Sequence, residues 1–303
     1  MSWLQLEFAV QTADVESLED TLLAHGALAI TLASEADEQI LEPAPGATPL
    51  WSLIRLSALM PLDVDLAQLR SALATGFQQT FEIKFIGEAD WQAQAQQYAA
   101  NRVFAGRLHL CPPEAPASSE FPEAQRLLLE PGMAFGSGTH PTTQLCLAWL
   151  AAHIKAGDRV LDYGAGSGIL AIGACLLGAS AVAVDYDQQA VTAAEENGQR
   201  NGLRVALESA SVDADLRVMH SDTWLAQADY ETFDVVVANI LAEPLRQLAA
   251  TLQGHMRAGG RLVLSGLLAE QVAEVAAAYT DVRFDEPELL DGWACLAGHK
   301  VAS

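Results

Sequence analysis

Three alternate glycines, with an aspartate before them and another after them, form the chemically most informative stretch of the chain. Asp162 precedes the sequence Gly-Ala-Gly-Ser-Gly, which begins at Gly164, and Asp185 ends the next apolar run. Glycines at this spacing let the backbone turn sharply and approach a ligand closely. An acidic side chain about 20 residues beyond such a loop accepts hydrogen bonds from ribose hydroxyls. The pattern therefore predicts a site for a cofactor that contains a nucleoside.

The spacing and the charge of this stretch indicate which nucleoside cofactor binds. A dinucleotide site requires G-x-G-x-x-G, whereas Gly164, Gly166 and Gly168 form G-x-G-x-G, and no Lys or Arg lies between Asp162 and Asp185. Negative charge repels a pyrophosphate but suits the sulfonium and the amino group of S-adenosyl-L-methionine. The three glycines alone are equally compatible with an ordinary strand-to-helix turn. The two aspartates favour the adenosylmethionine site.

A second motif spans residues 130–143 and has the sequence Glu-Pro-Gly-Met-Ala-Phe-Gly-Ser-Gly-Thr-His-Pro-Thr-Thr. Its glycines and prolines are incompatible with a helix or a sheet interior, so a shaped loop is predicted. Pro141 opens the following helix, where a threonine would cap the exposed amides. Thr143 has two open interpretations, a helix cap or a cofactor contact. We interpret His140 as a structural loop residue rather than a general base, because no acid lies at a defined spacing from it.

The third motif, residues 233–245, reads as a buried central strand that ends at Asn239. Ligands of open parallel sheets bind at the carboxyl ends of the strands, so we expect Asp162, Asp185 and Asn239 to meet in one crevice. Asp222 follows another strand, and we interpret it as a solvated loop residue rather than a contact to adenine.

The remaining elements place these motifs in the second of two domains. Residues 3–87 show the order βαββαβ, which is typical of a small ferredoxin-like α+β domain. We place that domain at residues 1–88, an Ala- and Gln-rich linker helix at 89–101, and an α/β domain at 102–303. Within the last domain the pattern predicts a helix over 245–256 and a turn at 259–260.

Composition excludes several classes of protein. Lys and Arg number 16 and Asp and Glu 39, which gives a net charge of −23. This charge repels nucleic acids and anionic lipid, so we expect neither as a partner. It would favour a basic partner, although acidity that serves only solubility explains it equally well. The four scattered cysteines indicate reduced, buried thiols without a metal site, and the N-terminus lacks signal-peptide features, so we expect a cytoplasmic protein.

The three motifs together resemble those of the bacterial ribosomal protein L-eleven methyltransferase family (PrmA). The resemblance rests on residues 135–143, 162–172 and 238–245, with further similarity at 265–271 and 292–295. It implies a class I (Rossmann-like) methyltransferase that transfers methyl groups from S-adenosyl-L-methionine to lysine side chains and to the N-terminal amine of a basic ribosomal protein. By motif position, the cofactor contacts fall on residues of all three motifs: Thr143, Gly164, Gly166, Asp185 and Asn239.

The resemblance also implies how the reaction proceeds. We expect a monomer without a dedicated catalytic acid or base, in which Asn239 orients the attacking amine. The linker and Ser137 depart from the family pattern, which leaves open how the first domain docks and which amines are reached. The alternatives are a methyltransferase acting on another protein, a small amine or a nucleic acid base, and a ribosome-assembly factor without activity.

Overall fold

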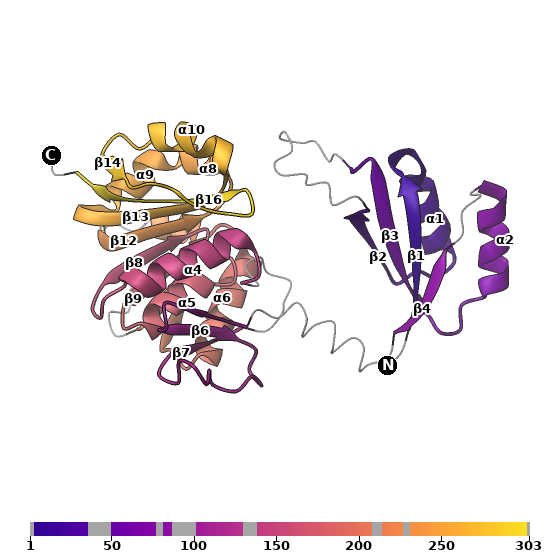
Figure 1. The fold of residues 1–303 in the computed structure, drawn as a ribbon, viewed down its shortest axis with the longest axis horizontal. Coiled ribbons are helices and arrows are strands. Elements are labelled where there is room, and N and C mark those ends of the chain that lie inside the picture. Colours follow the sequence, from indigo (N-terminus) through magenta and orange to yellow (C-terminus); the bar gives the residue numbers. More distant parts are fainter. Residues whose placement is uncertain are drawn as a thin grey trace. The chain divides into compact units, whose positions relative to one another are not determined.

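The structure is a computed structural model, and it describes residues 3–35, 50–76, 81–86, 101–129, 138–207, 214–226 and 231–301. The chain separates into two compact units, Met1–Ala95 and Gln96–Ser303, which are described in turn (Figure 1). The predicted linker helix lies outside the described residues except for Asn101. In the described ranges no helix is long and apolar enough to cross a membrane, and no group of three His, Cys, Asp or Glu side chains could hold a metal ion.

The first unit is a four-stranded antiparallel sheet with two helices. Its elements are β1 (Trp3–Gln11), α1 (Val15–Ala24), β2 (Ala29–Ser34), β3 (Leu53–Pro61), α2 (Leu66–Gly76) and β4 (Glu82–Ile86). The strand order is β2-β3-β1-β4. Alternate residues of β1, such as Leu6 and Phe8, are buried in one cluster with Leu18 and Leu22 of α1. This confirms the ferredoxin-like arrangement.

The second unit contains the sheet that carries the predicted site. Its strands are β8 (Arg159–Tyr163), β9 (Ser180–Asp185), β10 (Val205–Leu207), β11 (Leu216–His220), β12 (Phe233–Asn239), β13 (Met256–Leu268), β14 (Val282–Phe284), β15 (Glu288–Leu290) and β16 (Trp293–Lys300). The order is β10-β11-β9-β8-β12-β13-β16-β14, with β15 paired to β16. Strands β8 to β13 pair in parallel, and β14 to β16 are antiparallel. This is the mostly parallel, open α/β sheet that the sequence predicts.

Helices cover both faces of this sheet (Figure 1). They are α4 (Pro141–His153), α5 (Ile169–Leu176), α6 (Gln188–Arg200), α7 (Ser221–Leu225), α8 (Ala242–Gln247), α9 (Ala249–Gly254) and α10 (Val272–Ala277). Helices α4, α5 and α6 share one hydrophobic cluster with the sheet, and α7 to α10 share a second cluster on the opposite face. A smaller sheet of β5 (Arg102–Phe104), β6 (Leu108–Cys111) and β7 (Gln125–Leu128) packs with the first cluster. The central strands are therefore mostly apolar, because both of their faces are buried.

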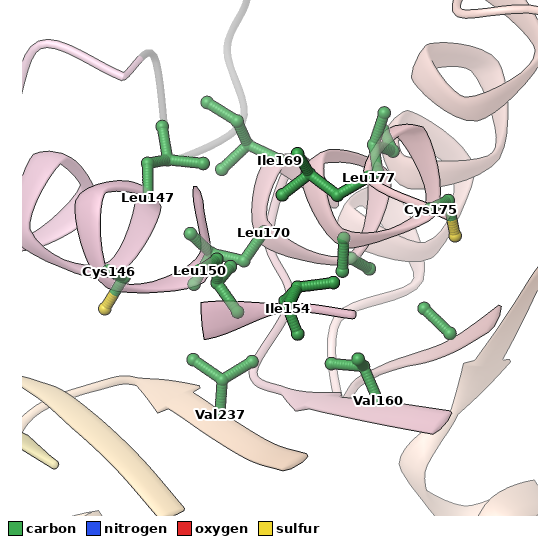
Figure 2. Close-up of a cluster of buried hydrophobic side chains, with 14 of the residues drawn as sticks. Cys146, Leu147, Leu150, Ile154, Val160, Ile169, Leu170, Cys175, Leu177 and Val237 are labelled. Atoms are coloured by element: carbon green, nitrogen blue, oxygen red, sulfur yellow. The ribbon is translucent and has the colours of Figure 1, made fainter. Parts of the chain in front are cut away.

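Figure 2 shows how the first cluster supports the predicted site. Ile169 and Leu170 of α5 and Leu150 of α4 pack above Val160 of β8 and Val237 of β12. These side chains are at most 3 % exposed. The start of α5, and with it the glycine loop, is thereby fixed against the strand ends. All four cysteines are buried and free, as predicted.

Three details of the second unit differ from the sequence expectation. The helix predicted over 245–256 is two helices, and the first begins at Ala242 with Pro244 in its opening turn, where a missing N–H has no cost. The turn predicted at 259–260 lies inside β13, where Gly259 adopts a φ of +67° next to a register shift against β12. Asp222 lies in helix α7 rather than in a loop, although its side chain is 89 % exposed.

Candidate cofactor-binding site

The glycine loop joins β8 to α5 and requires glycine at two of its positions for packing. Gly164 and Gly168 have φ values of +77° and +76°, which side chains rarely adopt. A Cβ on Gly164 would lie 2.3 Å from Cγ2 of Ile240, and a Cβ on Gly168 would lie 2.9 Å from that of Ala194. Gly166 also has a positive φ, of +53°. The glycines therefore let the loop lie directly against the end of β12 and against α6.

Asp185 ends β9, the strand beside β8, and its carboxylate organises the loop. Its Oδ2 accepts a hydrogen bond from the backbone N–H of Gly166 at 2.8 Å, and its Oδ1 accepts one from Asp187 at 3.0 Å. The residue is 8 % exposed. Because each carboxylate oxygen has a second lone pair, Asp185 can still accept hydrogen bonds from a ligand while the loop holds it in place.

Asp162 lies on β8, directly before Tyr163 and the glycine loop, and is 1 % exposed. Its Oδ2 accepts a hydrogen bond from the N–H of Ala171 at 3.0 Å, whereas its Oδ1 is buried without a partner among the described residues. Burial raises the pKa of this carboxyl to about 7, the negative charge of Asp185 acts in the same direction, and the Ala171 hydrogen bond opposes them. A cationic group beside Asp162 would stabilise its ionised form.

Asn239 and Thr143 come together from two motifs that are 96 residues apart. Asn239 ends β12, which pairs with the other edge of β8, and its Nδ2 donates to Oγ1 of Thr143 at 3.4 Å. Thr143 is completely buried in α4, and Oδ1 of Asn239 is buried without a partner among the described residues. Asn239 thus presents an acceptor whose position is set by a contact on its other side.

The predicted threonine cap of α4 is wrong, because His140 occupies the N-cap position. The Nδ1 of His140 lies 2.7 Å from Oγ1 of Thr142 and accepts a long hydrogen bond of 3.4 Å from the Thr142 N–H. Its ring makes an edge contact with Trp293, with 4.8 Å between the ring centroids. Burial lowers the pKa of His140. Thr143 is thereby left inside the helix, where its hydroxyl contacts Asn239 instead of capping.

One part of the site was not predicted, namely the close packing around Ile240. Gly266, just beyond Ser265 on β13, has a φ of +88°, and a Cβ there would lie 2.3 Å from the carbonyl oxygen of Ile240. Ile240 is therefore confined between Gly164 on one side and Gly266 on the other. This confinement fixes the chain just after Asn239. The sequence signal is weak, namely the Ser265-Gly266 pair that follows a buried apolar run.

The described residues fit a cationic, nucleoside-containing cofactor. Two buried acceptors, Oδ1 of Asp162 and Oδ1 of Asn239, have no donor in the described part of the chain, and they belong to adjacent parallel strands. The loop carries three glycines with positive φ, and Asp185 retains accepting capacity beside it. Of the second motif, residues 130–137 lie outside the described residues.

Comparison with known proteins identifies the family. The model of the family described as "Ribosomal protein L11 methyltransferase (PrmA)" matches residues 2–301. The chain belongs to this family. The resemblance seen in the sequence is thus confirmed and extends over nearly the whole chain. As the sequence predicted, the cofactor of this methyltransferase is S-adenosyl-L-methionine.

Relatives within the family are similar over their full length. The ribosomal protein L11 methyltransferase of Pseudomonas aeruginosa (strain LESB58) is 42 % identical over 307 residues, covering all of both chains. That of Azotobacter vinelandii is 43 % identical over 304 residues, covering 98 % of this chain and 99 % of the relative. The crystal structure of a ribosomal protein L11 methylase from Lactobacillus delbrueckii subsp. bulgaricus is 33 % identical with a TM-score of 0.55, covering 65 % of this chain and 96 % of that one. The Rossmann-like methyltransferase fold is confirmed.

Proposed function

We propose that this chain methylates lysine side chains and the N-terminal amine of ribosomal protein L11. The observation that carries the proposal is the pair of buried acceptors without donors, on Asp162 and Asn239, beside a glycine loop held by Asp185. The relatives bear the name of that substrate. The chain has 39 acidic and 16 basic residues, and this excess of negative charge suits a basic protein substrate.

Each site residue has a proposed task in holding the cofactor. Asp185 would accept hydrogen bonds from ribose hydroxyls, and Gly164 and Gly166 would let the loop backbone approach the ligand. Asp162 would face the cationic part, because it combines a negative charge with an unpartnered oxygen. Thr143 would contribute by holding Asn239. When bound, the cofactor supplies an electrophilic methyl group.

The acceptor amine must be neutral and aligned before it can attack. An apolar, dehydrated surrounding lowers the pKa of a lysine, which favours loss of its proton without a dedicated base. Oδ1 of Asn239 would accept a hydrogen bond from the amine and so direct the nitrogen lone pair. Alignment and desolvation, rather than a nucleophile of the enzyme, would then account for most of the acceleration.

We assign substrate recognition to the ferredoxin-like domain, residues 1–88, followed by a linker at 89–101 and the methyltransferase domain at 102–303. The support is that the first sheet carries no arrangement of groups suited to catalysis, whereas every motif lies in the second unit. We also propose that the enzyme acts as a monomer in the cytoplasm, where ribosomal proteins are made.

The test is transfer of a labelled methyl group to ribosomal proteins from cells that lack this methylation. The label should appear on amines of one basic ribosomal protein, located by mass spectrometry of its peptides. Asn239→Ala should lower kcat about 100-fold through lost alignment. Thr143→Val keeps the amide acceptor and should lower kcat less, about tenfold. Label on nucleic acid only, or full activity of Asn239→Ala, would refute the proposal.

A further inference from the structure

A row of basic side chains crosses three strands of the second unit. Arg261 of β13 lies directly opposite His299 of β16, and His299 lies directly opposite Arg283 of β14. Residues that face one another across antiparallel strands project from the same face, about 5 Å apart. The guanidinium of Arg261 lies 5.6 Å from the ring centroid of Trp149 in α4, so the row is on the α4 face of the sheet.

Two members of this row, Arg261 and His299, line a pocket at the end of α4, whereas Arg283 lies outside the lining. The pocket has a volume of about 400 Å³, and its lining includes Arg261, His299, Asp285, Trp149 and His153. The rings of Trp149 and His153 stack with 4.5 Å between centroids, and Nδ1 of His153 bonds to the carbonyl oxygen of Trp149 at 2.8 Å. The second nitrogen of the His153 ring therefore remains available to a ligand.

The two guanidiniums of the row are among the basic groups that have no carboxylate partner in the described ranges. All 16 Lys and Arg residues lie in the described ranges, and seven of them form ion pairs with carboxylates there. Neither Arg261 nor Arg283 forms one within the described ranges. In a chain of charge −23, the two guanidiniums lie on either side of His299 without ion pairs, so these like charges repel each other. An anion between them would relieve that repulsion.

The pocket is separate from the cofactor site. Ser265 pairs with Asn239 at the carboxyl end of the sheet, and Arg261 precedes Ser265 by four residues. At about 3.3 Å per residue the two positions are about 13 Å apart along the strand. Helix α4 spans the same interval, because Thr143 lies in its first turn and His153 in its last.

We propose that this pocket binds a small phosphate-type oxyanion. Guanidinium groups present N–H donors in a planar fork that matches phosphate oxygens, and the two imidazoles add donors when protonated. Asp285 opposes the binding and limits the net positive charge of the pocket. A compact ion fits better than a nucleic acid, because only three basic side chains, Arg261, His299 and His153, line the pocket and the surrounding chain is acidic.

The test is calorimetric titration of the full-length protein with inorganic phosphate, at an ionic strength held constant with chloride. Phosphate should bind to the unaltered protein, and Arg261→Gln should weaken it about tenfold. Asp285→Asn should strengthen binding, because it removes the one carboxylate of the lining. Arg204→Gln is the matched control, since it changes the net charge equally at an exposed ion pair with Asp215, and it should leave phosphate binding unchanged.

A second variant guards against an effect on folding. Arg283→Gln leaves the stacking of Arg261 on Trp149 intact. Because Arg283 lies opposite His299 and outside the lining, its removal should weaken phosphate binding less, about threefold. Cofactor affinity should remain unchanged in every variant. The proposal is overturned if phosphate does not bind, if both arginine variants bind it as the unaltered protein does, or if a short RNA at equal phosphate concentration binds more tightly.

Discussion

Polar side chains at the amino ends of the parallel strands are paired with one another, whereas at the carboxyl ends some of them are not. At the amino ends, Glu231 accepts hydrogen bonds from Arg159 at 2.5 Å and from Arg217 at 2.7 Å, and Asp234 is paired with Arg257. At the carboxyl ends, buried oxygens of two side chains have no donor in the described residues. A buried acceptor without a partner costs about 1 to 3 kcal/mol. The polar groups at the amino ends are therefore paired within the protein, whereas two acceptors at the carboxyl ends remain for the ligand that we propose there.

The largest effect is expected from a change that displaces the end of β12. Gly266→Ala places a methyl group against the Ile240 backbone and should lower the free energy of unfolding by about 3 kcal/mol and cofactor affinity more than 100-fold. Gly292→Ala is the control, because Gly292 has a similar φ of +82° but nothing within 4 Å of the added Cβ. Gly292→Ala should lower the free energy of unfolding by about 1 kcal/mol and leave cofactor affinity unchanged. Denaturant unfolding and calorimetry measure both quantities, and equal effects of the two variants would contradict the proposed contact.

The next largest effect concerns the carboxylate that holds the loop. Asp185→Ala removes the acceptor of the Gly166 and Asp187 amides and should weaken cofactor binding about 100-fold. Asp187→Ala removes only the side-chain cap of α6, which accepts from Gln189, and should cost about 1 kcal/mol of stability with little change in affinity. Calorimetric titration with S-adenosyl-L-methionine separates the two. Similar affinities for both variants would contradict the role of Asp185.

A third effect follows from the raised pKa of Asp162, about 7 in the folded protein against about 3.9 in an unfolded chain. The folded state then binds this proton more tightly than the unfolded state does. The contribution of the protonated carboxyl to the free energy of unfolding is therefore complete below pH 4 and is lost as the pH rises to about 7. Between pH 5 and pH 8, the free energy of unfolding of the cofactor-free protein should fall by about 2.6 kcal/mol relative to that of Asp162→Asn. Denaturant unfolding at several pH values measures this difference, and parallel pH profiles would show that Asp162 has an ordinary pKa.

The smallest effect is expected at the amino ends. Glu231→Gln removes the charge that pairs with Arg159 and Arg217 and should lower the free energy of unfolding by about 1 kcal/mol, because these side chains are partly exposed. Glu243→Gln, at the more exposed pair with Arg246, should cost about 0.3 kcal/mol. Neither change should alter cofactor affinity. A loss of affinity in Glu231→Gln would show that the two ends of the strands are not independent.

The sequence predicted the strand ends well because their signals are local. Two apolar runs stop at Asp185 and Asn239, and alternate glycines follow Asp162. These patterns are enough to place the three side chains at the carboxyl edge of an open sheet. The βαββαβ order of the first unit was likewise visible in its alternating and helical patterns.

Three features of the second unit were not predicted from the sequence. The position of Ile240 between Gly164 and Gly266 is a property of three separate elements, and no spacing encodes it. His140 replaces a threonine as the cap of α4, although threonine has the stronger general preference. The helix predicted from residue 245 begins at Ala242 instead, with Pro244 in its first turn. Of these three features, only the packing around Ile240 depends on segments that are distant in the sequence.

Proton release on cofactor binding tests most directly whether the carboxyl ends are built for a cationic ligand. Calorimetry at pH 6.5 in two buffers of different ionisation enthalpy measures the number of protons exchanged when S-adenosyl-L-methionine binds. A cation beside Asp162 lowers the pKa of this carboxyl from about 7. Cofactor binding to the unaltered protein should therefore release a substantial fraction of one proton, whereas Asp162→Asn has no proton to release at this position. Equal proton exchange in the two proteins would contradict the placement of the cofactor's positive charge at Asp162.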